Sequence, residues 1–253
     1  MALLSVEKIT AGFGGFRALD DVDLKVGQGE LVGLIGTNGA GKSTLFSVAT
    51  GYIPASSGRV HFAGQDITGL AVHHRVRRGL ARTFQVPREF SNLTVFDNLM
   101  TAAPEQEGEK LSALVFSRGK IRQEEERLTA KVCDVMDFLN LRGVEGELAG
   151  KLSGGQKKLL ELGRLLMLEP KCIMLDEPFA GVNPVLIEQL CERVIELNQR
   201  GIAVLIIEHN LAELARIVPR LYAMDRGRVI AHGSPDAVLA DPAVREAYMG
   251  GVI

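Results

Sequence analysis

The chain has 253 residues, of which 46% are hydrophobic and 24% are charged, and its formal net charge is −2. This length suffices for one substantial domain with a subdomain, or for two small domains. The nearly balanced charge gives no electrostatic basis for binding nucleic acid across the whole surface, and no apolar run reaches the roughly 20 residues that a membrane-spanning helix needs.

The N-terminal part of the chain is predicted to form strands around a glycine-rich loop. Alternating apolar and polar residues, typical of strands with one face in water, occur in three segments: 3–10, 22–26 and 58–64. Residues 31–36 form an apolar run, as in a strand buried on both faces, and a helix is predicted over 42–50. Residues 1–10 have neither a basic segment nor a long apolar run, so we interpret them as the first strand and not as a signal peptide.

The segment 36-GTNGAGKST-44 matches the pattern GxxxxGK[ST] between a predicted buried strand and a predicted helix, which is the context of a phosphate-binding loop. Its glycines let backbone N–H groups approach phosphate oxygens, and the positive end of the following helix adds to the attraction. We expect Lys42 to reach the β- and γ-phosphates and Ser43 to bind Mg²⁺. The alternative is a glycine-rich turn without function. The residues predicted to bind nucleotide here are Gly36, Asn38, Gly39, Ala40, Gly41, Lys42, Ser43 and Thr44.

The rest of the chain first becomes helical and then alternates between strands and helices. From about Val95 to Leu139 apolar residues recur at helical spacing, with an exposed connection predicted over 101–110. Strands and helices are then predicted in turn over 172–176, 184–199, 202–208, 211–217, 220–225 and 228–232. This pattern predicts a doubly wound α/β core with an inserted helical subdomain.

Two further features have structural interpretations. The cysteines Cys133, Cys172 and Cys191 form no CxxC pair and no metal-ligand spacing, so we expect buried or half-buried residues in a reducing compartment. The basic run 73-HHRVRRG-79 is interpreted as a solvated helix face, although it could meet lipid head groups or a partner.

Two acids follow the predicted buried strand in 172-CIMLDE-177. Asp176 falls at the carboxyl end of the strand, where open α/β sheets bind ligands, and an acid there can hold Mg²⁺. Glu177 stands one residue beyond and could orient and polarise an attacking water molecule. The alternative is an ordinary exposed strand end.

The segment 152-LSGGQ-156 is a second glycine-rich helix start. Ser153 is a good N-cap, and Gly154 and Gly155 leave backbone donors open to an anion. The alternative is a cap that only stabilises its own helix. A second anion site that cannot share the phosphate of the first requires an anion from outside, which two chains placed head to tail would each supply.

The phosphate loop, LSGGQ and the Asp176–Glu177 pair, in this order, resemble the ATP-binding cassette (ABC) family over essentially the whole chain. The resemblance implies a P-loop NTPase (RecA-like) parallel sheet core with an N-terminal antiparallel β subdomain and an inserted α-helical subdomain. It implies one nucleotide-binding domain over 1–253, with a core of 1–88 and 158–253 and a helical subdomain of about 89–157. It also implies ATP and Mg²⁺ as cofactors, and ATP hydrolysis coupled to transport.

Further roles are implied residue by residue. Gln85, in 82-RTFQVPREF-90, resembles the Q-loop glutamine that touches Mg²⁺ and links core and helical subdomain. His209, in 205-LIIEHN-210, resembles the switch histidine that contacts the γ-phosphate and Glu177. Ser153, Gly154, Gly155 and Gln156 resemble the signature that faces ATP held by another subunit. Phe13 resembles the aromatic residue that stacks on adenine; nearby Phe16 is a rival, and a core phenylalanine is the structural alternative.

Asn183 stands where the general family has an aspartate, and puts in doubt any role that needs a carboxylate there. Together with the long segment 101–130 and the ending 241-DPAVREAYMG-250, it resembles the ATPase subunits of bacterial branched-chain amino acid importers. The implied partners are a second copy or a paralogous ATPase, two transmembrane permease subunits contacted near 86–96, and indirectly an extracytoplasmic solute-binding protein. The implied location is peripheral, on the cytoplasmic face of the cell membrane.

Two rival functions stay open. One is the same ATPase in a lipid or lipopolysaccharide export complex, against which the Asn183 position and the long segment 101–130 both count. The other is a soluble ABC protein acting on ribosomes or DNA, but the single cassette without heptads or net basic charge argues against nucleic acid as a partner.

Overall fold

The computed structural model describes residues 2–84, 88–104 and 118–249. The chain divides into two compact units. The core unit consists of Met1–Gln85, Pro170–Ala180 and Ile187–Ile253, and the helical unit of Val86–Glu169 and Gly181–Leu186. The helical unit thus spans the segment 89–157 predicted as a subdomain, and it also takes in the rest of the helix that begins at Gly154.

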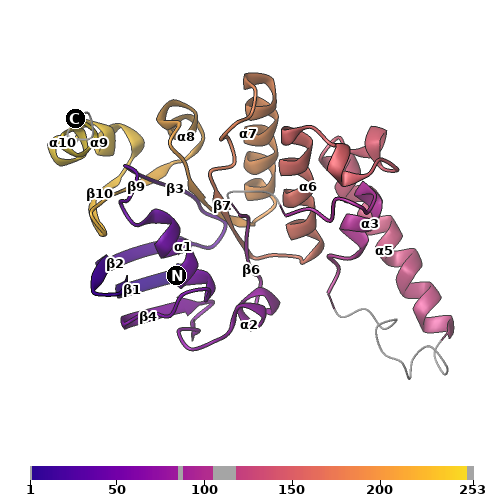
Figure 1. Ribbon diagram of the computed structural model, residues 1–253, viewed down its shortest axis with the longest axis horizontal. Coiled ribbons are helices and arrows are strands. Elements are labelled where there is room, and N and C mark those ends of the chain that lie inside the picture. The colour runs from indigo at the N-terminus through magenta and orange to yellow at the C-terminus, as the bar shows by residue number, and fades with distance from the viewer. Residues whose placement is uncertain (1, 85–87, 105–117, 250–253) are drawn as a thin grey trace. The chain divides into compact units, whose positions relative to one another are not determined.

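A six-stranded sheet forms the centre of the core unit, with the strand order β10-β9-β3-β8-β7-β6 (Figure 1). Its strands are β3 (Leu31–Gly36), β6 (Leu80–Arg82), β7 (Cys172–Asp176), β8 (Ala203–Ile207), β9 (Arg220–Asp225) and β10 (Arg228–Gly233). All neighbours are parallel except the hairpin β9–β10. Every residue of β3, β7 and β8 is buried, as is typical of parallel strands covered on both faces. The carboxyl ends of these three strands therefore lie at one edge of the sheet.

A second, antiparallel sheet of the core unit has the order β2-β1-β4-β5. Its strands are β1 (Ala2–Phe13), β2 (Phe16–Gly27), β4 (Ser57–Phe62) and β5 (Gln65–Asp66). Helix α1 (Lys42–Thr50) contacts strands of both sheets, and its Phe46 is fully buried in the cluster that joins them. Burial of this helix in the core fixes the position of the loop that precedes it.

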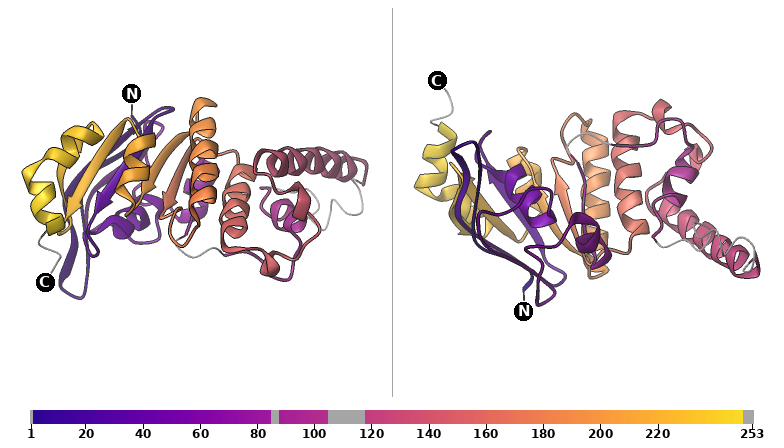
Figure 2. Two further views of the ribbon diagram at one scale, coloured as in Figure 1. Left: turned by 90° about the horizontal axis from the view of Figure 1, so that it is seen from above. Right: turned by 60° about the horizontal axis from the view of Figure 1, so that its bottom comes forward.

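The remaining helices follow the helical spacing of the sequence. In the helical unit they are α3 (Val95–Met100), α5 (Arg118–Phe138), the 3₁₀ turns η2 (Arg142–Val144) and η3 (Ala149–Lys151), and α6 (Gly154–Met167) (Figure 2). Helices α3, α5 and α6 contact one another through buried side chains such as Leu99, Met136 and Leu160. The other helices are α2 (Val72–Arg77), α7 (Pro184–Gln199), α8 (Leu211–Ile217), α9 (Pro235–Ala240) and α10 (Pro242–Met249).

The fold confirms the predicted α/β class with its antiparallel sheet and helical insert, and it adds short elements that the sequence pattern did not predict, among them β5, β6, α9 and α10. The cysteines are free, with Cys172 and Cys191 buried and Cys133 half-buried. The predicted exposed connection 101–110 extends into residues 105–110, which lie outside the described part of the chain.

The interpretation of 73–79 as a solvated helix face is wrong for one residue. Arg75 is only 3% exposed, and its guanidinium donates hydrogen bonds to four backbone carbonyls, those of Val48, Ala49, Thr68 and Leu70. The carbonyls of Val48 and Ala49 end helix α1, where intrahelical donors run out. A buried cation was not expected, because only the tertiary structure brings these carbonyls to the arginine.

Candidate nucleotide-binding and hydrolysis site

The phosphate-binding loop connects β3 to α1, as predicted. Gly39 and Gly41 have φ angles of 83° and 99°, in the left-handed region that favours glycine. A Cβ atom at Gly41 would lie 2.7 Å from the carbonyl oxygen of Ala18, so a larger residue would also collide with the β1–β2 sheet. Among the described residues no side chain caps α1, so the N–H groups of its first turn are available to an anion.

Lys42 lies inside this loop. Its Nζ donates hydrogen bonds to the carbonyl oxygens of Gly36 at 2.8 Å and Thr37 at 3.1 Å. Burial lowers the pKa of the Lys42 ammonium, while the nearby carboxylates of Glu177 and Asp176 act to raise it. The fold thus brings the lysine of the loop and the two acids after β7 into one electrostatic environment.

Asp176 is buried at the end of β7. Its Oδ2 accepts a hydrogen bond from Arg82 Nη2 at 2.8 Å, and its backbone N–H donates to Thr83 Oγ1 at 3.0 Å. Its other carboxylate oxygen, Oδ1, is buried with no hydrogen-bond partner among the described residues. Burial raises the pKa of this carboxyl, against the opposing effect of Arg82. An unpartnered carboxylate oxygen near the phosphate loop fits a hydrated Mg²⁺ ion.

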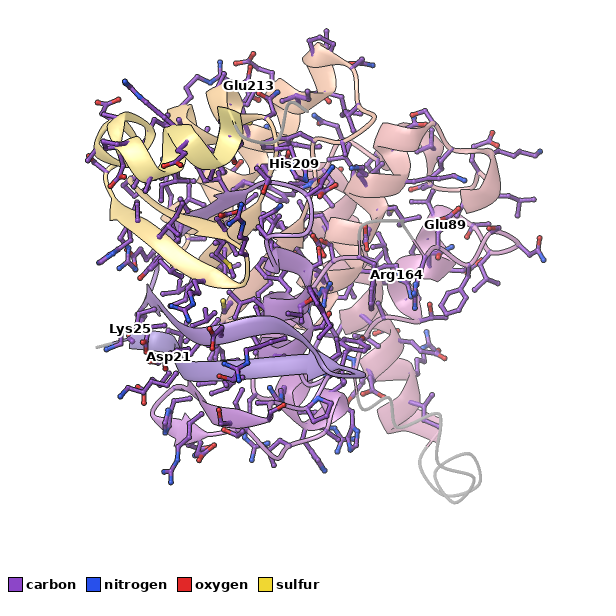
Figure 3. All side chains as sticks on the ribbon, turned by 60° about the vertical axis from the view of Figure 1, so that its left-hand side comes forward. Asp21, Lys25, Glu89, Arg164, His209 and Glu213 are labelled. Carbon is purple, nitrogen blue, oxygen red and sulfur yellow. The ribbon has the colours of Figure 1, made fainter. Side chains whose placement is uncertain are left out.

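Glu177 and His209 meet at the ends of β7 and β8. His209 Nε2 lies 2.8 Å from Glu177 Oε1, and the Glu177 N–H donates to the carbonyl of Ile207, the last residue of β8. His209 lies between β8 and α8 (Figure 3) and is more exposed than Glu177. A water molecule near this pair could therefore be contacted by a carboxylate and an imidazole together.

Sequence reasoning missed two charged residues of this site, Arg82 and Glu208. Besides Asp176, Arg82 donates to Ser47 Oγ of α1 at 3.0 Å, and its guanidinium lies 5.7 Å from the centre of the Phe46 ring. Glu208 directly precedes His209 and is buried. Its sequence signal is a charged residue at the end of an apolar strand, in 203-AVLIIE-208.

The predicted roles of Gln85, Phe13 and Phe16 are not settled by the positions of their side chains. Gln85 lies outside the described residues, as does the side chain of Phe13, which ends β1. Phe16, the rival for stacking on adenine, is highly exposed at the start of β2. The adenine contact and the Gln85 role stay predictions.

The signature segment lies in the helical unit and begins α6. Ser153 and Gln156 form a capping box: Ser153 Oγ accepts from Gln156 N at 3.3 Å, and Gln156 Oε1 accepts from Ser153 N at 2.9 Å. A Cβ at Gly155 would lie 1.4 Å from Leu186 Cδ2, whereas a Cβ at Gly154 would meet no described atom within 4 Å. Packing therefore requires a glycine at position 155, and space for an approaching group is left at Gly154. The structure thus shows the cap by which Ser153 stabilises its own helix. That the signature faces ATP bound by another subunit stays a prediction.

Asn183, the departure from the family pattern, caps the other helix of this region. Its Oδ1 accepts from the N–H of Leu186 at 3.0 Å, at the start of α7, which begins with Pro184. Asparagine and aspartate serve equally well as N-caps. The change at position 183 thus preserves the local structure and removes only a charge.

A glycine-rich loop between a buried parallel strand and a helix, with acids at the carboxyl end of β7 in the same sheet, defines a P-loop NTPase. The ABC transporter family matches residues 19–180, and a second family, described as branched-chain amino acid ATP-binding cassette transporter, matches residues 228–252. The chain belongs to the ABC transporter family of ATP-binding domains, whose members hydrolyse ATP.

Relatives match the chain from end to end. A probable branched-chain amino acid transport ATP-binding protein of Methanocaldococcus jannaschii is 41% identical over 99% of this chain and 98% of its own length. The lipopolysaccharide export system ATP-binding protein of Escherichia coli K12 is 37% identical over the same shares of both chains. The crystal structure of a nucleotide-free ATP-binding cassette from an ABC transporter is 41% identical over 98% of this chain and 99% of that one, with a TM-score of 0.85. A crystal structure of an ATP-binding cassette in its ADP conformation is 41% identical over 99% of each chain, with a TM-score of 0.84.

Proposed function

We propose that the chain is the ATP-hydrolysing subunit of a membrane importer for branched-chain amino acids or a related small polar solute. The observation that supports this cargo class is the end-to-end match, at 41% identity, to a relative with that described role. The second family match over 228–252 supports the same class independently of the phosphate loop. Within the part of the chain that the structure describes, no helix is long and apolar enough to cross a membrane.

In the proposed reaction, water attacks the γ-phosphorus of ATP and ADP leaves. Glu177 takes the proton of the attacking water, and His209, 2.8 Å from that carboxylate, contacts the γ-phosphate. Lys42 and the N–H groups of the loop stabilise the negative charge that spreads over the phosphates. Mg²⁺, held by Ser43, Asp176 and Gln85, would neutralise further phosphate charge when bound.

We further propose that two cassettes associate head to tail, with the signature at Ser153 of each facing ATP in the other. ATP would favour the closed pair, and hydrolysis would favour the open one. The second cassette is either another copy or a paralogue. The proposed complex also contains two permease subunits and, indirectly, a solute-binding protein, and it lies at the cytoplasmic face of the cell membrane.

The helical unit offers support for a permease contact near 86–96. The ring of Phe90 is 51% exposed, and the Arg164 guanidinium lies 4.8 Å from its centre. Glu89 lies beside Arg164 (Figure 3) and pairs with Lys157 at 2.8 Å. An exposed aromatic ring among fixed charges suits a short amphipathic helix of a partner.

The second candidate function is a lipid or lipopolysaccharide export ATPase. It is favoured by the relative from E. coli, which matches over the same length at 37% identity. An export ATPase and an importer ATPase would share the hydrolysis site and differ in their membrane partners, so the identity of the partner subunits distinguishes the two functions.

The test is to tag the chain in its native host, extract the membranes gently and identify the co-purifying proteins by mass spectrometry. Two permease subunits, a second cassette and a solute-binding protein are expected for the importer. Co-purification of lipopolysaccharide-transport components instead would establish the export function. Recovery from the soluble fraction alone, or with ribosomes, would overturn both transport proposals.

A further inference from the structure

We propose that Glu208 is a positioning residue for ATP hydrolysis: it holds the loop after β7 and the loop after β8 so that Glu177 and His209 face each other. This inference rests on the proposed function of that pair and adds a residue that no sequence motif assigned.

The first observation is the placement of its carboxylate between two loops. Glu208 is 2% exposed. One oxygen, Oε1, accepts a hydrogen bond from the N–H of Phe179 at 2.5 Å, in the loop after β7. The other, Oε2, accepts from the N–H groups of His209 at 3.0 Å and Asn210 at 3.4 Å, in the loop after β8. One side chain thus connects two backbone segments that are far apart in sequence.

The second observation is the chemistry of the contacts. Each of these three groups is an N–H donor, and an ionised carboxylate accepts at both oxygens and donates at neither. Hydrogen bonds to an ionised group are shorter and stronger than neutral ones, and a buried charge without such partners would be costly. A glutamine would fit the same space, but its NH₂ group would face an N–H donor on one side. The site therefore requires a carboxylate, not merely a polar residue.

The third observation connects these loops to the reacting groups. Phe179 lies two residues after Glu177, and His209 directly follows Glu208, so both ends of the bridge adjoin the pair that is 2.8 Å apart. Glu177 has a φ angle of 51°, a strained conformation that persists only where the surroundings hold it. Since the oxygens of Glu208 are engaged by backbone N–H groups, it acts through Glu177 and His209 and does not itself meet the substrate.

The test compares Glu208→Gln in two backgrounds, with ATP hydrolysis measured at saturating ATP. In the wild-type background we expect the rate to fall about 10- to 100-fold, as for a misplacement of reacting groups by about 1 Å. ATP affinity should be nearly unchanged, and the melting temperature should fall because the NH₂ group of the glutamine leaves a buried N–H donor unpaired. In the His209→Ala background, the same substitution should lower the residual rate by less than about twofold, because no imidazole is left to position. Glu192→Gln on the exposed face of α7 is the matched control and should leave the rate unchanged.

Each failure has a distinct meaning. If His209→Ala and Glu177→Gln keep the wild-type rate, the proposed hydrolytic pair itself is wrong. If those variants lose activity but Glu208→Gln keeps the rate, or lowers it equally in both backgrounds, the positioning role is overturned. Should Glu208→Gln fail to fold, Glu208→Asp replaces it in the same comparison, since it keeps the carboxylate and shortens its reach.

Discussion

Glu177 combines two properties that seldom occur together in a residue that only stabilises a fold. Its backbone adopts a φ angle of 51°, which costs of order 1–3 kcal/mol for a side chain other than glycine. Its carboxylate is largely buried and contacts His209. The strained backbone places the side chain beyond the strand end, near the phosphate loop, and so gives a physical reason for the assignment of a hydrolytic role to this acid.

The first prediction concerns Glu177→Gln. The substitution keeps the size of the side chain but removes its ability to accept a proton, so ATP hydrolysis should fall by about 10²- to 10⁴-fold. ATP binding should persist, because Lys42 and the loop backbone are intact, and a nucleotide-bound dimer should accumulate. Phosphate release and size-exclusion chromatography with ATP measure the two effects. A wild-type rate would show that another group activates the water.

At the scale of elements, the second prediction concerns the buried arginine between α1 and α2. Arg75→Met keeps an apolar stem but removes one donor from each of four carbonyls. Of these, the carbonyl of Val48 keeps the N–H of Gly51 as a partner. We expect the free energy of unfolding to fall by about 3 kcal/mol, measured by urea denaturation. Arg59→Met, at an exposed position of β4, should change it by less than about 0.5 kcal/mol. Equal effects of the two substitutions would contradict the proposed role of Arg75 in closing the end of α1.

The third prediction separates the two signature glycines. Gly155→Ala places a methyl group against Leu186, so the helical unit should lose about 1–3 kcal/mol of stability through overpacking. Gly154→Ala meets open space and should leave the melting temperature unchanged or slightly higher, because alanine favours a helix. Thermal denaturation monitored by circular dichroism compares the pair. A destabilisation by Gly154→Ala as large as that by Gly155→Ala would mean that the first turn of α6 is packed differently.

Local patterns of the sequence predicted those elements that contiguous residues determine. The run 31–36, the glycine loop and the Ser153 cap each specify their own conformation, so the loop between β3 and α1 and the start of α6 have the predicted structure. Contacts between distant segments were not predictable. Arg82 bonds to Asp176 from a different strand, and Glu208 bonds to Phe179 across two loops. The sequence contains no pattern that pairs Arg82 with Asp176 or Glu208 with Phe179, because only the order of strands in the sheet brings these residues together.

At the scale of the whole molecule, the residues that we propose to handle ATP are divided between the two units. The phosphate loop, Asp176, Glu177 and His209 belong to the core unit, and Ser153 with its glycines belongs to the helical unit. The chain therefore carries one phosphate loop with its acids and one signature segment. The helix start at Gly154 leaves space for an anion. Under the proposed head-to-tail pairing, each ATP is bound by the core unit of one chain and the helical unit of the other.

The fourth prediction tests this division by mixing two inactive variants. Lys42→Ala removes the cation of the phosphate loop, and Gly154→Arg fills the space at the signature without disturbing the Ser153 cap. We call each ATP site between the phosphate loop of one chain and the signature of the other a joint, so that a dimer has two joints. Alone, each variant should have both joints of its dimer damaged. It should hydrolyse ATP at least about 10²-fold more slowly, as expected when groups that stabilise transition-state charge are lost. In a mixed dimer, the intact loop of one chain would meet the intact signature of the other.

Mixing equal amounts should therefore restore activity that neither variant has. If chains pair at random, about half of the dimers are mixed and each has one intact joint of two, so the recovered rate should approach about a quarter of the wild-type rate. The control is each variant mixed with itself at the same total concentration, together with melting temperatures that show both are folded. If the mixture is no more active than the sum of its parts, while Glu177→Gln still forms ATP-bound dimers, each chain must complete its own site, and the signature at Ser153 would then act on the nucleotide of its own core unit.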